Sequence, residues 1–188
     1  LRMSRGNHRE GKMMMRMTWR TSILGACVAL VGTAVGTAAQ TAPTDDSMGE
    51  AAELVRQADA VVEAKSDWGR AALLYQEAAE LSDGDPVAAT RHRQAGILAF
   101  YAGREGRAVE QLTHAAETAL EWGDVATAAR SYLEAAWVAH QEGDGERTLS
   151  LAERAERLAR SPLLARAERA DLMRRIAEPQ APEFEPDA

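Results

Sequence analysis

The chain has 188 residues, of which 46% are hydrophobic, 27% charged and 5% aromatic, and this length fits one domain or two. Its formal net charge is −7, and the acidic residues lie almost entirely after residue 39, because residues 1–39 contain only Glu10. An acidic body repels phosphate groups, so we expect no nucleic-acid partner. The single cysteine, Cys27, leaves the rest of the chain without a disulfide, a thiol nucleophile or a cysteine-bound zinc ion.

Residues 1–39 have the organisation of a secretory signal peptide. We expect translation to begin near Met13, which leaves residues 1–12 untranslated. Two arginines then form a positive head, an uncharged apolar stretch follows, and the stretch ends in the small residues that a signal peptidase accepts. This order predicts cleavage after Ala39 and an extracytoplasmic location, which we expect to be a bacterial periplasm.

Two alternatives for this segment stay open. The uncharged stretch 21–39 is long enough to cross a bilayer, so an uncleaved signal anchor is the first. The second is lipidation of Cys27, because Leu24-Gly25-Ala26-Cys27 resembles a bacterial lipobox. Positive charge before the apolar stretch and acidic residues after it place the body outside the cytoplasm in each case.

After a linker over 40–48, the body has the composition of a helical protein. Ala, Leu, Arg, Glu and Gln dominate, and all of them favour helices. Pro86 and Pro162 each follow a residue that can cap a helix, so both predict helix starts. Turn residues such as Gly143 and Gly145 mark the breaks. The predicted helices cover roughly 49–65, 67–82, 86–102, 105–121, 125–141, 145–160 and 162–177.

A pattern of small residues recurs with a period of about 40 residues. Its members lie three and four residues apart, so each set occupies one helix face. The sets are Ala71, Tyr75 and Ala78, then Ala108, Leu112 and Ala115, then Thr148, Ala152 and Ala155. Small residues on such a face let two antiparallel helices approach closely. A repeat of two helices each predicts stacked helical hairpins.

These motifs resemble the tetratricopeptide repeat family. Segment 67–78 is similar to the second half of such a repeat, with its small residue, aromatic residue and alanine in the same order. Ala95-Gly96 is similar to the leucine-glycine pair of the first helix, and Tyr132 stands where the motif has tryptophan. The likeness covers about 49–160, although the period here is longer by about one helical turn.

This resemblance implies an all-α fold, in which antiparallel helical hairpins stack into a short α-solenoid over residues 49–178. The helix predicted at 162–177 would cap the array. In that family the first helix of each hairpin lines a concave groove that holds an extended peptide. Carried over to this chain, the groove-lining residues would be Arg56, Arg93, Ile97, Tyr101, Arg130, Leu133, Trp137 and His140.

Aromatic and arginine side chains suit a peptide groove, because the first bury area and the second bind carboxylates. We expect Arg93 or Arg130 to hold an acidic group of the peptide. The alternative, from the pattern alone, is that Ile97, Phe100 and Trp137 form core between hairpins, as apolar helical stripes often do.

No constellation in the sequence points to catalysis. There is no glycine-rich phosphate loop and no nucleophile elbow, and the histidines form no His-x-x-x-His pair. His92 lies on the packing face, which predicts a partly buried structural role. His114 lies one turn from Glu110 and Glu117, which predicts an ion pair or, alternatively, a metal site. We expect no enzyme, no cofactor and no metal.

The expected function is therefore that of a non-enzymatic extracytoplasmic adaptor that binds a protein or peptide partner. A small-ligand or lipid-binding module and a self-associating structural module are the alternatives. Residues 179–188 are rich in proline and acidic residues, and predict a disordered tail.

Overall fold

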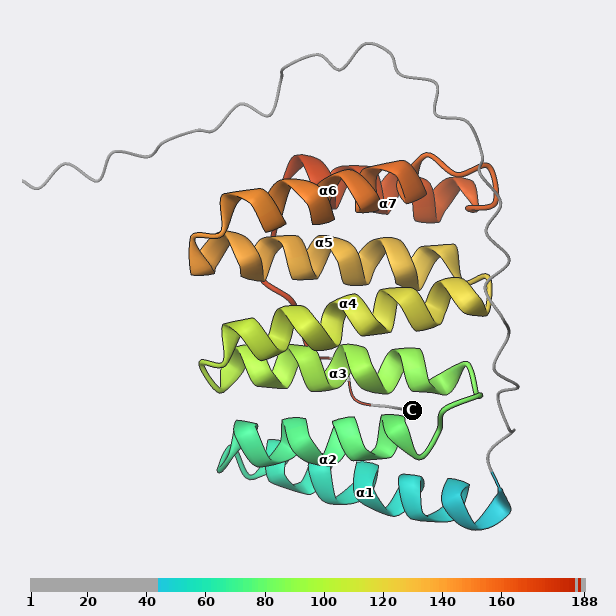
Figure 1. Cartoon of the computed structure of the whole chain (residues 1–188), viewed down its shortest axis with the longest axis vertical. Helices are drawn as coiled ribbons and strands as arrows, with labels where there is room; N and C mark the ends of the chain where they lie inside the picture. Colours follow the sequence, from blue (N-terminus) through green and yellow to red (C-terminus); the bar gives the residue numbers. More distant parts are fainter. Residues whose placement is uncertain (1–43, 185, 187–188) are drawn as a thin grey trace, which may run out of the picture. The chain divides into compact units, whose positions relative to one another are not determined.

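The computed structural model describes residues 44–184 and 186 (Figure 1). The predictions for the signal peptide, an anchor, Cys27 and the start of translation lie outside these residues. Every regular element in the described part is an α-helix, as the sequence predicts. The helices are α1 (Asp45–Glu63), α2 (Trp68–Glu80), α3 (Val87–Tyr101), α4 (Glu105–Glu121), α5 (Val125–Glu142), α6 (Gly145–Ala159) and α7 (Arg166–Ala177).

The first and last helices begin at residues other than those predicted. Helix α1 begins at Asp45, inside the predicted linker 40–48, because the side chain of Thr44 caps it by accepting the Ser47 N–H at 3.3 Å. Helix α7 begins at Arg166 and not at Pro162, since residues 162–164 form a turn.

Aspartates start three of the remaining helices. The carboxylates of Asp67, Asp124 and Asp144 each accept the backbone N–H three residues further on, at 2.9–3.0 Å. Such caps satisfy donors that a helix leaves unpaired at its first turn. Gly143 ends α5 with a φ of 84°, a conformation that glycine adopts without strain.

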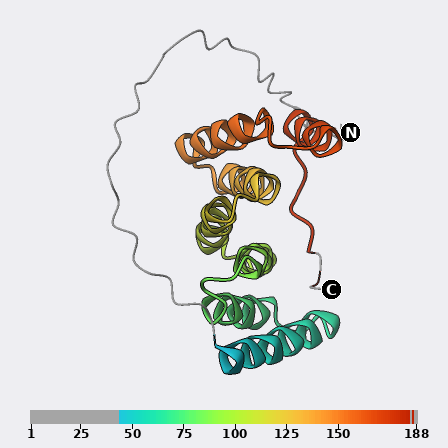
Figure 2. The ribbon, with the colours of Figure 1, turned by 90° about the vertical axis from the view of Figure 1, so that its right-hand side faces the viewer.

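Each helix packs against the next one in the chain, and α3 also contacts α5, as α5 contacts α7. The described helices therefore form two layers, with α3, α5 and α7 on one side and α2, α4 and α6 on the other (Figure 2). No helix among residues 44–184 combines the length and the apolar character that crossing a membrane requires.

The core consists largely of alanine. Eight of the nine residues in the repeating sets are buried, and Ala152 is half-buried. The larger side chains at their centre are Tyr75, Ile97, Leu98 and Leu112, all with 0% exposure. The predicted faces are thus the faces on which the helices meet.

Helices α3 and α4 approach each other closely at Gly96 of α3. A Cβ atom there would lie 2.7 Å from Cγ of Leu112 and 3.1 Å from the carbonyl oxygen of Ala108, both on α4. These separations are shorter than van der Waals contact, so only glycine fits without a shift of α4.

We expect Gly96→Ala to lower the free energy of unfolding by about 1–3 kcal/mol, because the added methyl group overpacks the contact between α3 and α4. The measurement is chemical denaturation followed by circular dichroism. Gly49→Ala in α1 is the matched control, since a Cβ at Gly49 meets nothing within 4 Å. It should stabilise the chain by up to about 1 kcal/mol through helix propensity alone. Equal effects of the two substitutions would contradict the steric argument.

Candidate functional site

The segment that follows α7 lies along the layer formed by α3 and α5. In Figures 1 and 2 it leaves α7, runs past α5 and continues toward α3. The hydroxyl of Tyr101, at the end of α3, donates a hydrogen bond of 3.0 Å to the carbonyl oxygen of Pro182. The ring of Phe184 meets the ring of Tyr75 edge-on, with 5.9 Å between centroids. Pro182 is fully buried.

The sequence predicts a disordered tail, and in the structure residues 179–184 of that tail contact the helices. Composition suggested disorder because the segment is polar and acidic overall. Its two apolar anchors, Pro182 and Phe184, nevertheless bury surface against the helices. Proline also restricts the free chain, which lowers the entropy lost on docking.

Four aromatic side chains contact one another in a row, and we call them the aromatic band; two of them, Tyr101 and Trp137, meet this segment. They are Trp68 of α2, Phe100 and Tyr101 of α3, and Trp137 of α5. Successive ring centroids are 5.7 Å (Trp68–Tyr101), 5.6 Å (Phe100–Tyr101) and 5.2 Å (Phe100–Trp137) apart. These are the separations of favourable tilted and edge-on pairs. Most of the tryptophan and phenylalanine residues that the structure describes therefore lie on one surface, although the chain is poor in aromatic residues.

Three of the predicted groove residues meet the tail directly. Arg130, Leu133 and Trp137 of α5, together with Glu134 and Arg175, form the wall of a small pocket. Residues 179–181 close its other side. The space left is about 20 Å³, enough for roughly one water molecule. With Tyr101, four of the eight predicted residues are therefore at the tail.

Two predicted groove residues are buried instead. Ile97 is 0% exposed and belongs to the core, so the alternative interpretation holds for this residue. Arg93 was expected to hold an acidic group of a peptide, but it is paired with Glu134 of α5. Its Nε and Nη2 atoms lie 2.8 and 2.6 Å from the two carboxylate oxygens, and both side chains are 6% exposed.

The sequence contained a signal for this pair that our prediction missed. Arg93 and Glu134 are 41 residues apart, which is one repeat. A buried arginine requires a compensating carboxylate, and the equivalent turn of the next hairpin is the place to look for it.

The remaining two predicted residues do not take part in the described contacts of the tail. Arg56 is exposed on α1 and pairs with Glu53. His140 is exposed in the last turn of α5. Trp68 was missed in the sequence, because it lies on the second helix of a hairpin and only first helices were expected to line a groove. Phe184 was missed because it lies in the segment predicted to be disordered.

We expect Glu134→Ala to lower the free energy of unfolding by about 3 kcal/mol, because it removes the carboxylate from a buried arginine. Denaturation curves in urea measure the change. The matched control is Glu153→Ala, which breaks an exposed pair with Arg157 at 3.9 Å and should cost under about 1 kcal/mol. A loss at Glu134 no larger than at Glu153 would show that the buried pair is not a structural element.

His92 has the structural role that the sequence predicts. Its side chain is buried, and Nδ1 lies 2.9 Å from Oε1 of Gln111. The ring of His114 is 4.2 Å away, centroid to centroid. Burial lowers the pKa of His92 below its ordinary 6.5; the hydrogen bond with Gln111 opposes this shift, and the nearby His114 adds to it. Glu80 and Asp83 act weakly in the opposite direction.

This shift makes stability depend on pH. Below about pH 6.5 the unfolded chain binds a proton at His92 that the folded chain resists, so the free energy of unfolding should fall as the pH falls. We expect His92→Gln to flatten this fall between pH 7 and pH 5 in denaturation curves. His140→Gln, at an exposed histidine, is the control and should leave the slope nearer to that of the wild type. The reverse order would refute the assignment.

The expected ion pair of His114 is not among the described contacts. Glu117 instead pairs with Arg154 at 3.8 Å, and the ring of His114 lies tilted against the ring of His92. Within residues 44–184, no three metal-binding side chains converge.

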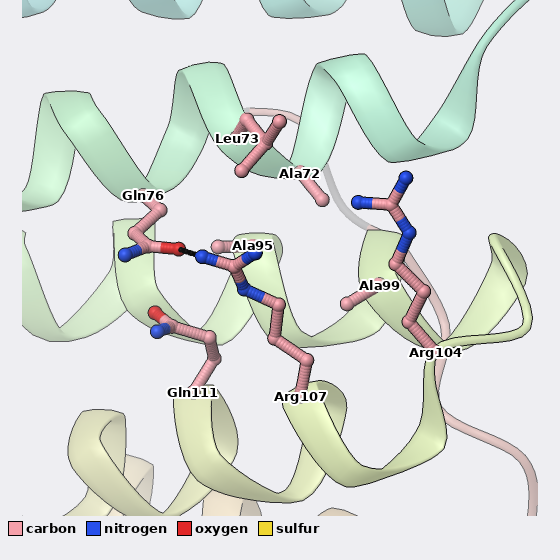
Figure 3. A pocket seen from close by; sticks show the side chains of 8 residues that line it. All are labelled: Ala72, Leu73, Gln76, Ala95, Ala99, Arg104, Arg107 and Gln111. Carbon is pink, nitrogen blue, oxygen red and sulfur yellow. Dashed lines mark hydrogen bonds between the residues drawn. The ribbon is translucent and has the colours of Figure 1, made fainter.

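Two other hollows lie between the described helices. One lies between α2, α3 and α4 and has a volume of about 10 Å³; in Figure 3, Arg107 reaches across it to donate to Oε1 of Gln76 at 3.0 Å. The other, of about 220 Å³, is open and lies between α5 and α7, beside Arg130 and Asp171. Both are smaller than most small-molecule sites, which occupy about 300–1,000 Å³.

Comparison of the chain with family models, with characterised proteins and with solved structures gives no match.

Proposed function

We propose that this chain is a non-enzymatic interaction module that binds an extended segment of a protein along the layer of α3 and α5. The observation that carries the proposal is the seated tail. Residues 179–184 are an extended stretch of polypeptide, held by a hydrogen bond from the Tyr101 hydroxyl to the backbone carbonyl of Pro182 and by the contact of Phe184 with the ring of Tyr75. A surface that holds one extended segment has the shape and the donors to hold another.

Other features support a tetratricopeptide-like architecture for this module. Two helices alternate in each hairpin, the hairpins pack in chain order, and the helix seams are built from small residues. Gly96 makes the close helix contact at the position where the motif has its glycine. We propose that the array works outside the cytoplasm, because the basic and apolar pattern of residues 1–39 is that of an export signal.

The aromatic band supplies the affinity in this proposal. Aromatic side chains bury large areas with few rotatable bonds, and they dominate the binding energy of many interfaces. Tyr101 is 43% exposed, so part of its ring is open to a partner even with the tail in place. The small volumes of the pockets weigh against a small-molecule ligand.

Site-specific photo-crosslinking tests the proposal. A photoreactive phenylalanine analogue placed at Tyr101, in cells that produce the protein naturally, should yield covalent adducts with a defined protein. The same analogue at Leu149 is the control, since Leu149 is 55% exposed but lies on α6. Identical adducts at both positions, or none at Tyr101, would argue against a binding surface on α3 and α5.

A further inference from the structure

We propose that the tail is an intramolecular competitor. It occupies the layer of α3 and α5 until it is displaced by a partner segment with the same chemistry: extended, with a proline and an aromatic residue two positions later. This inference rests on the proposed function and deepens it, because it names the kind of partner and a means of regulation.

The alternation of burial along the tail shows which of its residues the helices contact. Pro182 is fully buried, Glu183 is exposed and Phe184 is half-buried. In an extended chain, residues i and i+2 point to the same side. The helices therefore contact Pro182 and Phe184, while Glu183 faces away. A partner segment needs a proline and an aromatic residue at this spacing, whereas the residue between them can be of any type.

Proline suits the first position for a second reason. A buried backbone must have its polar groups paired, and proline has no N–H. The remaining polar group at Pro182 is the carbonyl oxygen, and the Tyr101 hydroxyl pairs with it. Any other residue would bury an N–H donor at this point, and would need an additional acceptor.

The position of Phe184 is defined by the ring of Tyr75, which is itself held in place. The Tyr75 hydroxyl donates to Oδ1 of Asp59 at 2.7 Å, and Tyr75 is 0% exposed. Its ring therefore presents a fixed surface, against which Phe184 stands edge-on at 5.9 Å. An aromatic side chain matches this geometry better than an aliphatic one.

The tether makes the tail an effective competitor. Helix α7 ends at Ala177, and Pro182 lies only a few residues beyond it. A short tether holds the segment at a local concentration of the order of millimolar. A partner then binds with an affinity reduced by the fraction of molecules whose tail is released.

The test uses the full chain with and without its anchors. The probe is a fluorescently labelled synthetic peptide with the sequence of residues 179–188, and its affinity is measured by anisotropy. The Pro182→Ala/Phe184→Ala chain should bind the probe at least tenfold more tightly than the wild type does. Glu183→Ala, the matched control between the anchors, should behave as the wild type does. Circular dichroism checks that all variants keep their helices.

Two further arms complete the design. A probe with alanine at the positions of Pro182 and Phe184 should not bind the opened chain. Adding Tyr101→Phe to the opened chain should weaken the original probe, because it removes the donor to the proline carbonyl and leaves the ring.

Each other outcome overturns the inference in a recognisable way. Equal affinity for wild-type and opened chains would show that the tail does not compete, although a segment-binding surface would stand. No binding to the opened chain would reject the proline and aromatic chemistry, and the crosslinks at Tyr101 would then decide the proposed function separately. A dimer of the wild type that the anchor substitutions abolish would place the tail in a second copy rather than in its own chain.

Discussion

The helices of this chain lie close together because the residues between them are small. Alanine fills most positions on the facing sides, and Gly96 takes one where a Cβ atom would collide with Leu112. Small side chains bury little apolar area each, so the packing relies on many short contacts between neighbouring helices rather than on a few large side chains. Trp68, Tyr101 and Trp137 keep part of their surface exposed on one side of the helices, whereas Tyr75 and Tyr132 belong to the core.

The helices and their ends could be predicted because residues close to them in the sequence specify them. Caps such as Asp124 and turn glycines such as Gly143 act within one turn of chain, and helical spacing identified the packing faces. Helix order and class followed from these signals. The start of α7 did not, because Ser161 and Pro162 have the chemistry of a helix start and yet lie in a turn.

The candidate site could be predicted only in part, since it depends on contacts between distant residues. Tyr101, Arg130, Leu133 and Trp137 were named because the resemblance to tetratricopeptide repeats implies a groove along their helices, on which they fall at helical spacing. The burial of Arg93 depends on Glu134, which lies 41 residues further on, so only a comparison of positions about one period apart could have suggested the pair. The contacts of the tail could not be predicted for the same reason, because Pro182 and Phe184 are anchors only in the presence of Tyr101 and Tyr75.

The hydrogen bond between Tyr101 and Pro182 joins residues that are 81 positions apart. Each described helix packs mainly on its neighbours in the chain, and the stability of such an arrangement is close to a sum over nearest neighbours, so its ends can fray. The tail runs from the end of α7 to α3, so it connects the last helix to a helix in the middle of the chain. Binding of the tail therefore makes thermal unfolding more cooperative. Release of the tail would let the C-terminal helices unfold separately from the rest.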